Sequence, residues 1–87
     1  MIFTVKAEVS LKRGHFDPEG DVAAKALRDL GFGVASVRVG KTYTIKVEAA
    51  DASEAEAAAK EMCRRLLSNP TKDDFKVEVL GFEGRSG

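Results

Sequence analysis

The stretch ASVRVGKTYTIKVEA (residues 35–49) decides how many strands this chain contributes to its fold. Apolar and polar side chains alternate on both sides of the pair Gly40–Lys41. Strict alternation places every second side chain on the same face, which is typical of a β-strand with one buried face. Two such runs around a glycine predict a β-hairpin, with strands over 35–39 and 42–49 and a turn at Gly40–Lys41.

Working outward, alternating runs also lie over residues 3–11 and 75–79, near the two ends of the chain. Between the strands, over 17–31 and 51–68, the apolar spacing becomes that of an amphipathic helix. The predicted order is therefore βαββαβ, which places the chain in the α+β class. The apolar stripe of the first helix consists of Val22, Ala23, Ala26, Leu27 and Leu30, and that of the second of Ala55, Ala58, Ala59, Met62, Cys63 and Leu66.

Each helix has one apolar stripe and each strand has one apolar face that must be buried. The economical arrangement is a single domain over residues 3–80, in which two helices cover one face of an antiparallel sheet, ferredoxin-like or a close variant. The glycine-rich residues 81–87 are predicted to form a flexible tail.

The stretch HFDPEGD (residues 15–21) combines one histidine with three acidic side chains. Asp17 suits the N-cap of a helix, Pro18 suits the first helical position, and acidic residues in the first turn favour the helix dipole. A helix start explains these residues, and they lack the i, i+4 pairing of a helical metal site. Anion contact stays open as a weaker alternative, because the stretch is preceded by basic side chains beside helix amides. Its candidate residues are Lys12, Arg13 and His15.

The second helix is rich in alanine and offers Ser53 and Glu56 at the spacing of a capping box. We expect it to end at Asn69–Pro70, because a residue before proline is pushed out of helical geometry. Cys63 lies among apolar neighbours and is predicted to be a buried free thiol, since a single cysteine cannot form an internal disulfide.

The composition of the 87 residues excludes several classes of partner. Fourteen basic residues balance fourteen acidic ones, which argues against binding to nucleic acid or to an anionic membrane surface. No apolar run approaches the roughly 20 residues that span a bilayer, and the N-terminus does not resemble a signal peptide, so a cytoplasmic location is expected. The small core and exposed strand edges favour self-association.

Motifs for catalysis are absent from the sequence. Gly40–Lys41 lacks the flanking residues of a phosphate-binding loop, so a turn or a lysine presented to a partner explains it better. Nothing suggests a Ser-His-Asp grouping, the asparagine expected in an acylphosphatase sheet is missing, and the open sheet face lacks the aromatic residues of an RNA-recognition domain. We therefore expect no catalytic residues and no metal ligands.

Several blocks, in their order and spacing, resemble the PurS family, the small subunit of phosphoribosylformylglycinamidine synthase. They are DPEG (17–20), ALRDLGF (26–32), VRVGK (37–41), MCRRLLSNP (62–70) and DDFKVEV (73–79). The resemblance covers about residues 3–80, although the strand TYTIKVEA matches only in its alternation and the tail falls outside the pattern.

This resemblance implies a non-catalytic subunit that self-associates as a dimer or tetramer and bridges a glutaminase and a large synthetase. It would help to transfer ammonia between them in purine biosynthesis. It implies no cofactor on this chain, while the assembled enzyme would use ATP and magnesium. The blocks make Arg38, Gly40, Lys41, Asn69 and Pro70 the candidate partner-binding residues. The alternatives are a free-standing ferredoxin-like domain that binds a small regulatory ligand and, behind it, a purely structural homodimer.

Overall fold

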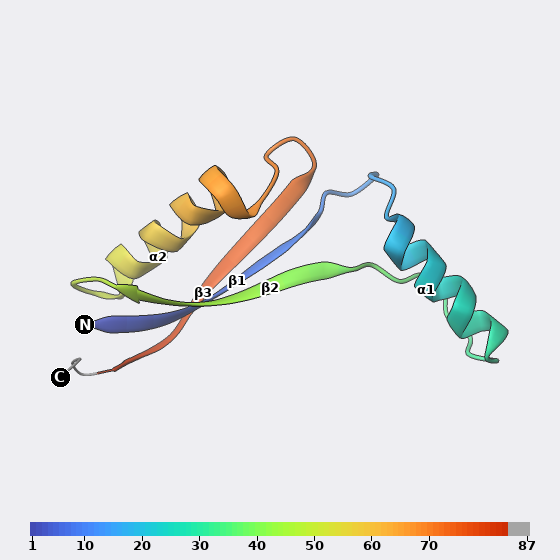
Figure 1. Cartoon of the computed structure of the whole chain (residues 1–87), viewed down its shortest axis with the longest axis horizontal. Helices are drawn as coiled ribbons and strands as arrows, with labels where there is room; N and C mark the ends of the chain where they lie inside the picture. Colours follow the sequence, from blue (N-terminus) through green and yellow to red (C-terminus); the bar gives the residue numbers. More distant parts are fainter. Residues whose placement is uncertain (84–87) are drawn as a thin grey trace.

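The structure is a computed structural model that describes residues 1–83 (Figure 1). Its strands are β1 (Ile2–Leu11), β2 (Gly40–Glu48) and β3 (Asp73–Glu83), and its helices are α1 (Pro18–Asp29) and α2 (Ala52–Met62). A short π-helical segment, η1 (Cys63–Leu67), continues α2. The α+β class, the antiparallel sheet and the two helices are thus confirmed.

The sheet has the order β2-β1-β3, with β1 antiparallel to both neighbours. The register places Val5 of β1 opposite Ile45 and Val79, so the apolar faces of all three strands coincide. An irregularity between Thr4 and Val5 shifts the register of β3 by one residue, and the ring of Phe82 then lies 5.5 Å from that of Phe3. The predicted alternation therefore builds one apolar sheet face.

The hydrophobic core lies between this face and α2. Ala55 and Ala59 are completely buried against Phe3 and Val5, and Cys63 is completely buried at the end of the helix. Small side chains on α2 allow the helix to approach the sheet closely, so that alanine side chains can fill the interface. The prediction that α2 covers the sheet, with Cys63 as a buried thiol, is confirmed.

The second predicted strand is wrong for the single chain. Residues 35–39 form no strand, and within residues 1–83 no backbone-to-backbone hydrogen bond outside the helices and strands involves 34–39. Gly40 and Lys41 begin β2 instead of forming a hairpin turn, so the chain runs on from residue 39 into that strand (Figure 1). Alternation sets which side chains share a face, but a strand also requires a neighbour, and this chain does not fold back to supply one.

The prediction that both helices cover the sheet is wrong for α1. This helix lies beyond one end of the sheet, joined to it by the segments before and after it (Figure 1). The chain measures 52 × 28 × 15 Å, and its radius of gyration is 16.7 Å, whereas a compact domain of this length has about 12 Å. An apolar stripe requires a covering surface, but its pattern does not say which chain provides that surface.

The helix and strand ends follow the local sequence with two exceptions. Asp17 caps α1, and Gly31 follows the helix with a φ of 99°, both as predicted. The cap of α2 is Asp51, two residues before the predicted Ser53, because its carboxylate accepts from the amide of Glu54. Strand β3 continues to Glu83, so residues 81–83 of the predicted tail are strand, and 84–87 lie outside the described residues.

Candidate functional site

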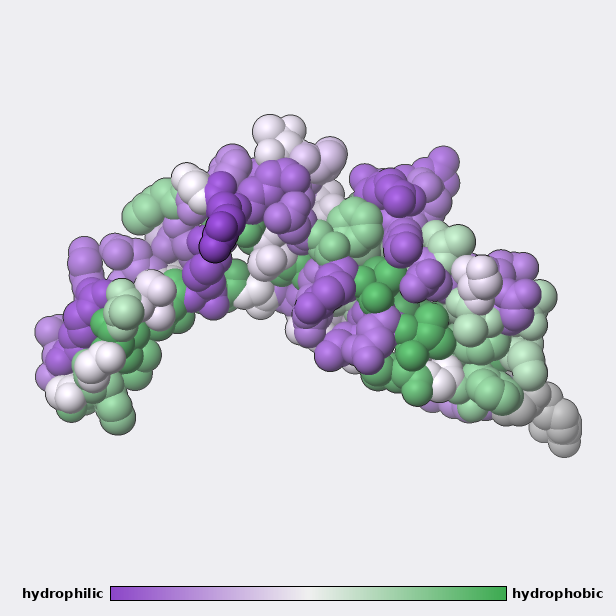
Figure 2. Space-filling model, turned by 180° about the vertical axis from the view of Figure 1, so that it is seen from behind, coloured by the Kyte–Doolittle hydropathy of each residue, from purple (hydrophilic) through white to green (hydrophobic). Residues whose placement is uncertain are grey.

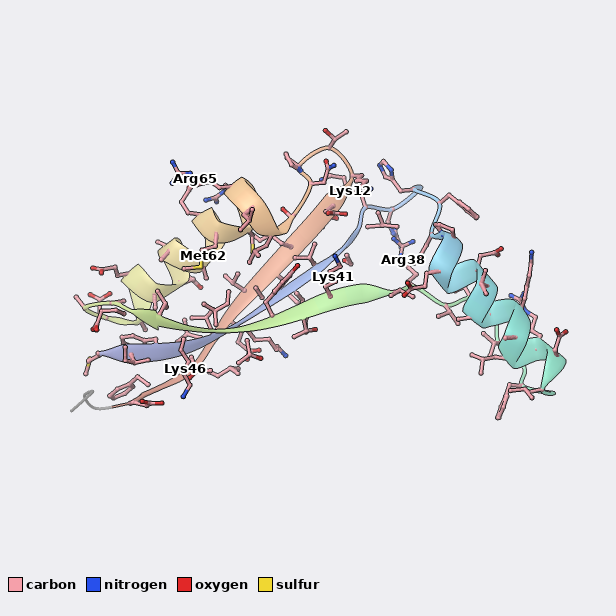
Figure 3. The ribbon with its side chains drawn as sticks, in the orientation of Figure 1. Lys12, Arg38, Lys41, Lys46, Met62 and Arg65 are labelled. Atoms are coloured by element: carbon pink, nitrogen blue, oxygen red, sulfur yellow. The ribbon has the colours of Figure 1, made fainter. Side chains whose placement is uncertain are left out.

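Three segments meet at the end of the sheet nearest α1: the loop after β1, the chain entering β2 and the loop before β3. Figure 3 shows Lys12, Arg38 and Lys41 at this meeting point. Every candidate residue from the sequence lies on these segments, so the fold gathers residues that are as many as 58 positions apart. We call this region the junction surface; it consists of Lys12, Arg13, His15, Arg38, Gly40, Lys41, Asn69 and Pro70.

An open trough of about 530 Å³ borders the junction surface, which contributes Gly40 and Lys41 to its lining, and it lies between the end of η1 and the start of α1. Its lining mixes apolar side chains that are buried or partly buried with charged side chains that are mostly exposed. Apolar Val9, Leu11, Val39 and Leu67 contribute, as do charged Asp17, Glu19, Lys41, Lys72 and Asp73. A lining that combines apolar and charged side chains is compatible with a protein–protein contact, where an apolar core is surrounded by polar residues.

Arg38 remains exposed, and its side chain connects two segments of the junction surface. Its guanidinium donates to the carbonyl oxygens of Leu11 at 2.7 Å and Lys12 at 3.4 Å. These bonds tie the segment after α1 to the end of β1. Arg38 therefore has a structural role. Within residues 1–83, the side chain of Lys41, the other basic residue of the VRVGK block, forms neither a hydrogen bond nor an ion pair, and it is exposed.

Asp17 joins the two ends of the α1 region. One carboxylate oxygen accepts from the amide of Gly20 at 2.8 Å, and the other accepts from the amide of Val39 at 2.8 Å. Both hydrogen bonds stabilise the ionised carboxylate and so lower the pKa of Asp17 below its usual value. The bond from Val39 has the larger effect. The first-turn amide of Gly20 thus already has a carboxylate partner, which reduces the scope for an external anion at this helix start.

The remaining candidates differ in how far they are engaged. The ammonium of Lys12 pairs with Asp74 at 2.9 Å, while Arg13 and His15 are exposed. The side-chain oxygen of Asn69 accepts from the amide of Thr71 at 2.9 Å, which shapes the turn before β3 and leaves Pro70 exposed. Asn69 is thus a turn residue. Pro70 and Lys41 are the exposed partner-binding candidates whose side chains make no hydrogen bond within residues 1–83.

Charged side chains on the polar face of the sheet form ion pairs with one another. Lys6 lies 3.3 Å from Glu8 and 3.6 Å from Glu78, and Glu8 is also 3.9 Å from Lys76. Glu8, followed by Glu78, raises the pKa of Lys6. These pairs are exposed to water and contribute little to the free energy of unfolding. This face of the sheet is therefore solvated.

Within residues 1–83, no group of three or more His, Cys, Asp or Glu side chains is arranged to hold a metal ion. None of the helices in this part of the chain is long and apolar enough to cross a membrane. The described surface offers the edges of the outer strands, exposed apolar side chains and isolated charges. These features suit contact with other chains.

Sequence reasoning missed three features of this region. Arg28 donates to the carbonyl oxygens of Val34 and Ala35, both at 2.9 Å, and so fastens the segment after α1 to the helix. Asp17 reaches Val39, 22 positions away. Lys72 lines the trough although it lies outside the blocks used for the resemblance. Of these features, only that of Arg28 had a signal in the sequence, namely a basic residue in the last turn of α1. The other two depend on contacts between residues far apart in the chain.

The fold and this surface define a small antiparallel α+β protein with an open sheet edge, a detached helix and an exposed junction for other chains. Comparison with known proteins narrows this class. A family model described as PurS, phosphoribosylformylglycinamidine (FGAM) synthase, matches residues 4–81. The chain therefore belongs to the PurS family.

Individual relatives agree with this assignment. The PurS subunit of phosphoribosylformylglycinamidine synthase from Archaeoglobus fulgidus is 43% identical over 70 residues, covering 79% of this chain and 88% of that protein. The Bacillus subtilis subunit is 35% identical, with 90% and 93% covered.

Solved structures are similar as well. The PurS subunit of Thermotoga maritima superposes with a TM-score of 0.86 at 30% identity, over 92% of this chain and 93% of that one. A chain in the structure of PurLQS from T. maritima gives a TM-score of 0.85 at 30% identity, over 92% of this chain and 99% of that one.

Proposed function

We propose that the chain is the non-catalytic small subunit of a glutamine- and ATP-dependent phosphoribosylformylglycinamidine synthase of purine biosynthesis. In this role it bridges a glutaminase subunit and a large synthetase subunit and supports the transfer of ammonia between them. The observation that carries the proposal is the match, over 92% of this chain, to a chain in the structure of PurLQS from T. maritima.

The junction surface supports a bridging role on physical grounds. A bridging subunit needs exposed surfaces that can be desolvated on contact, and the lining of the trough supplies both apolar and charged side chains. Lys41 lines the trough and is exposed, and Pro70 is exposed in the loop that also contributes Lys72 to the lining. We propose that at least one of the two larger subunits binds here.

The proposal includes self-association of the chain, in the cytoplasm, with no cofactor of its own. ATP and magnesium then belong to the synthetase subunit. Self-association is supported by the open edge of β2 and by the extended shape of the single chain, whose radius of gyration is 16.7 Å.

Reconstitution with the large synthetase and glutaminase subunits of the same organism tests the proposal. Addition of this chain should restore glutamine-dependent synthase activity, while activity with ammonium salts should depend on it much less, because only glutamine requires a docked glutaminase. Equal glutamine-dependent activity with and without the chain would refute the bridging role, and a regulatory ligand-binding domain would then be the better reading.

Lys41→Ala gives a sharper test of the junction surface than a change at Arg38, which also holds two backbone carbonyls. We expect the amount of chain needed for half-maximal glutamine-dependent activity to rise about fivefold or more, as for an interface residue that contributes over about 1 kcal/mol. The matched control is Lys46→Ala, on the same strand but with its side chain on the opposite, polar face. Equal effects of the two changes would show that the junction surface does not bind a subunit.

A further inference from the structure

The end of α2 leaves a leucine side chain in water where the sequence pattern predicts burial. Leu66 follows Ala59 by seven positions, about two turns of an α-helix, so a regular helix would place both on the buried face. Ala59 is completely buried, as predicted, but Leu66 is 82% exposed. Of the large apolar side chains within residues 1–83, that of Leu66 is the most exposed. The apolar stripe predicted for the second helix is therefore wrong at Leu66.

The π-helical segment η1 accounts for this difference. Its hydrogen bonds span five residues instead of four, so each turn is wider and the chain returns to the buried face one residue later. Leu67, which is partly buried, takes the place that a regular helix would give to Leu66. The wide turn thus keeps a leucine against the sheet and turns Leu66 outward.

Ser68 fixes this wide turn at its end. Its amide, at 2.9 Å, and its hydroxyl, at 2.8 Å, both donate to the carbonyl oxygen of Cys63, five positions earlier. π-Helical turns are rare, and they lie frequently at functional sites. A turn that is closed by two hydrogen bonds and yet exposes a leucine favours a role for the side chains that it exposes.

The same turn exposes two arginines that share one carboxylate. Glu61 lies 3.2 Å from the guanidinium of Arg64 and 4.0 Å from that of Arg65. Arg64 also lies over the ring of Phe75, 5.8 Å from the ring centre, so it is engaged within the chain. The side chain of Arg65 is 81% exposed and projects from the end of the helix (Figure 3). One positive charge is thus in excess among Glu61, Arg64 and Arg65, beside the exposed leucine.

This helix end is separate from the apolar surface of α1 and adjoins the trough. Figure 2 shows mostly hydrophilic atoms projecting where α2 ends, well apart from the apolar atoms on the part of the molecule that contains α1. Leu67, the residue after Leu66, lines the trough. A protein that covers the trough can therefore also reach Leu66 and Arg65.

We propose that Leu66 and Arg65, here called the anchor, bind one of the two larger subunits of the proposed complex. Leu66 enters an apolar pocket of that subunit, and the guanidinium of Arg65 pairs with a carboxylate at the border of the pocket. Contacts between proteins have an apolar centre with charge at its border, and arginine is enriched among the residues that contribute most to binding. The inference rests on the proposed function and assigns to it a contact outside the junction surface.

The chemistry of the anchor indicates a protein partner different from this chain. Leu66 gains free energy only where apolar surface is removed from water, which requires an apolar surface on the partner. Arg65 gains most from a carboxylate that can accept two parallel hydrogen bonds. A two-fold contact between copies centred on the anchor would bring two Arg65 side chains together, and like charges oppose such a contact.

Truncation of the two side chains tests the anchor in the reconstituted synthase. The unmodified chain, Leu66→Ala and Arg65→Ala are titrated into fixed amounts of the large synthetase and glutaminase subunits, and glutamine-dependent activity is measured. We expect the concentration for half-maximal activity to rise about tenfold or more for Leu66→Ala, because the burial of a leucine side chain is lost. For Arg65→Ala we expect a rise of about fivefold or more.

The matched controls make the same changes outside the anchor. Leu80→Ala alters another exposed leucine, on β3, and Arg64→Ala alters the arginine that already lies over Phe75. Each control should change the half-maximal concentration by less than about twofold. The melting temperatures of both anchor variants should stay close to that of the unmodified chain, because both side chains are exposed.

Several results would overturn the inference. Half-maximal concentrations equal to that of the unmodified chain would show that the anchor binds no subunit, while the proposed function would stand. A clear fall in the melting temperature of Leu66→Ala would show that Leu66 packs within its own chain. An equal rise in the self-association constant for dissociation, measured by sedimentation equilibrium, would show a contact between copies. If the unmodified chain fails to raise glutamine-dependent activity, the proposed function falls and the anchor falls with it.

Discussion

Asp17 illustrates how one side chain can serve both a helix and a distant segment. Its carboxylate accepts from the amides of Gly20 and Val39, so it needs its negative charge in the folded state. We expect Asp17→Asn to lower the melting temperature at pH 7 by about 5 °C, because an amide is a weaker acceptor at both bonds.

The pH dependence of this difference follows from the lowered pKa of Asp17. The stability that the carboxylate contributes is complete above its usual value of 3.8 and is lost as the pH falls through the depressed folded value. Melting curves of both proteins should therefore converge as the pH is lowered from 5 to about 2. A constant difference over this range would contradict the assignment.

Gly20 is required by close packing between α1 and the segment after it. A Cβ at this position would collide with the carbonyl oxygen of Val37 and come within 2.9 Å of the Asp17 carboxylate. Helix propensity alone would make Gly20→Ala stabilising by up to about 1 kcal/mol. We expect the collision to dominate, so urea denaturation should show a less stable protein. Gly33→Ala is the matched control, since a Cβ there meets nothing within 4 Å, and it should leave stability unchanged or slightly raised.

Among the elements, α2 has the tightest packing on the sheet. Ala59 is fully buried against the core, whereas Ala57 on the same helix is exposed. Ala59→Leu should cost about 1–3 kcal/mol of unfolding free energy, because the added carbons must push the helix from the sheet. Ala57→Leu should change stability by less than about 0.5 kcal/mol, as surface substitutions do. Similar unfolding midpoints for the two variants would mean that α2 is not seated as described.

At the scale of the assembled protein, the exposed apolar stripe of α1 gives a prediction about the self-association included in the proposed function. The side chains of Leu30 and Leu66 are 74% and 82% exposed in the single chain. A charged side chain at either position should therefore change the stability of the single chain little. Burial of Leu30 in a second copy would contribute about 2 kcal/mol, so Leu30→Asp should raise the dimer dissociation constant about thirtyfold or more. Leu66→Asp should leave it nearly unchanged. Sedimentation equilibrium measures both dissociation constants, and equal constants for the two variants would count against self-association through α1.

The sequence by itself determined the local features of this protein. Alternation in β1, β2 and β3 fixed their faces, the apolar stripes located both helices, and Asp17 and Gly31 marked the two ends of α1. These features depend on neighbours within a few positions along the chain, which is why they can be read from residue types alone. The blocks of the PurS resemblance were equally local, and the family model confirms the resemblance over residues 4–81.

Only the tertiary structure decided where α1 and residues 34–39 lie. The pattern ASVRVGK specifies an extended run with one apolar face, and it is satisfied equally by a strand within the same chain or in another chain. The hydrophobic effect rewards the removal of apolar area from water and does not depend on which chain provides the cover. The bonds of Arg38 to Leu11 and of Asp17 to Val39 likewise join residues far apart in sequence, so they follow from the fold and could not be predicted before it.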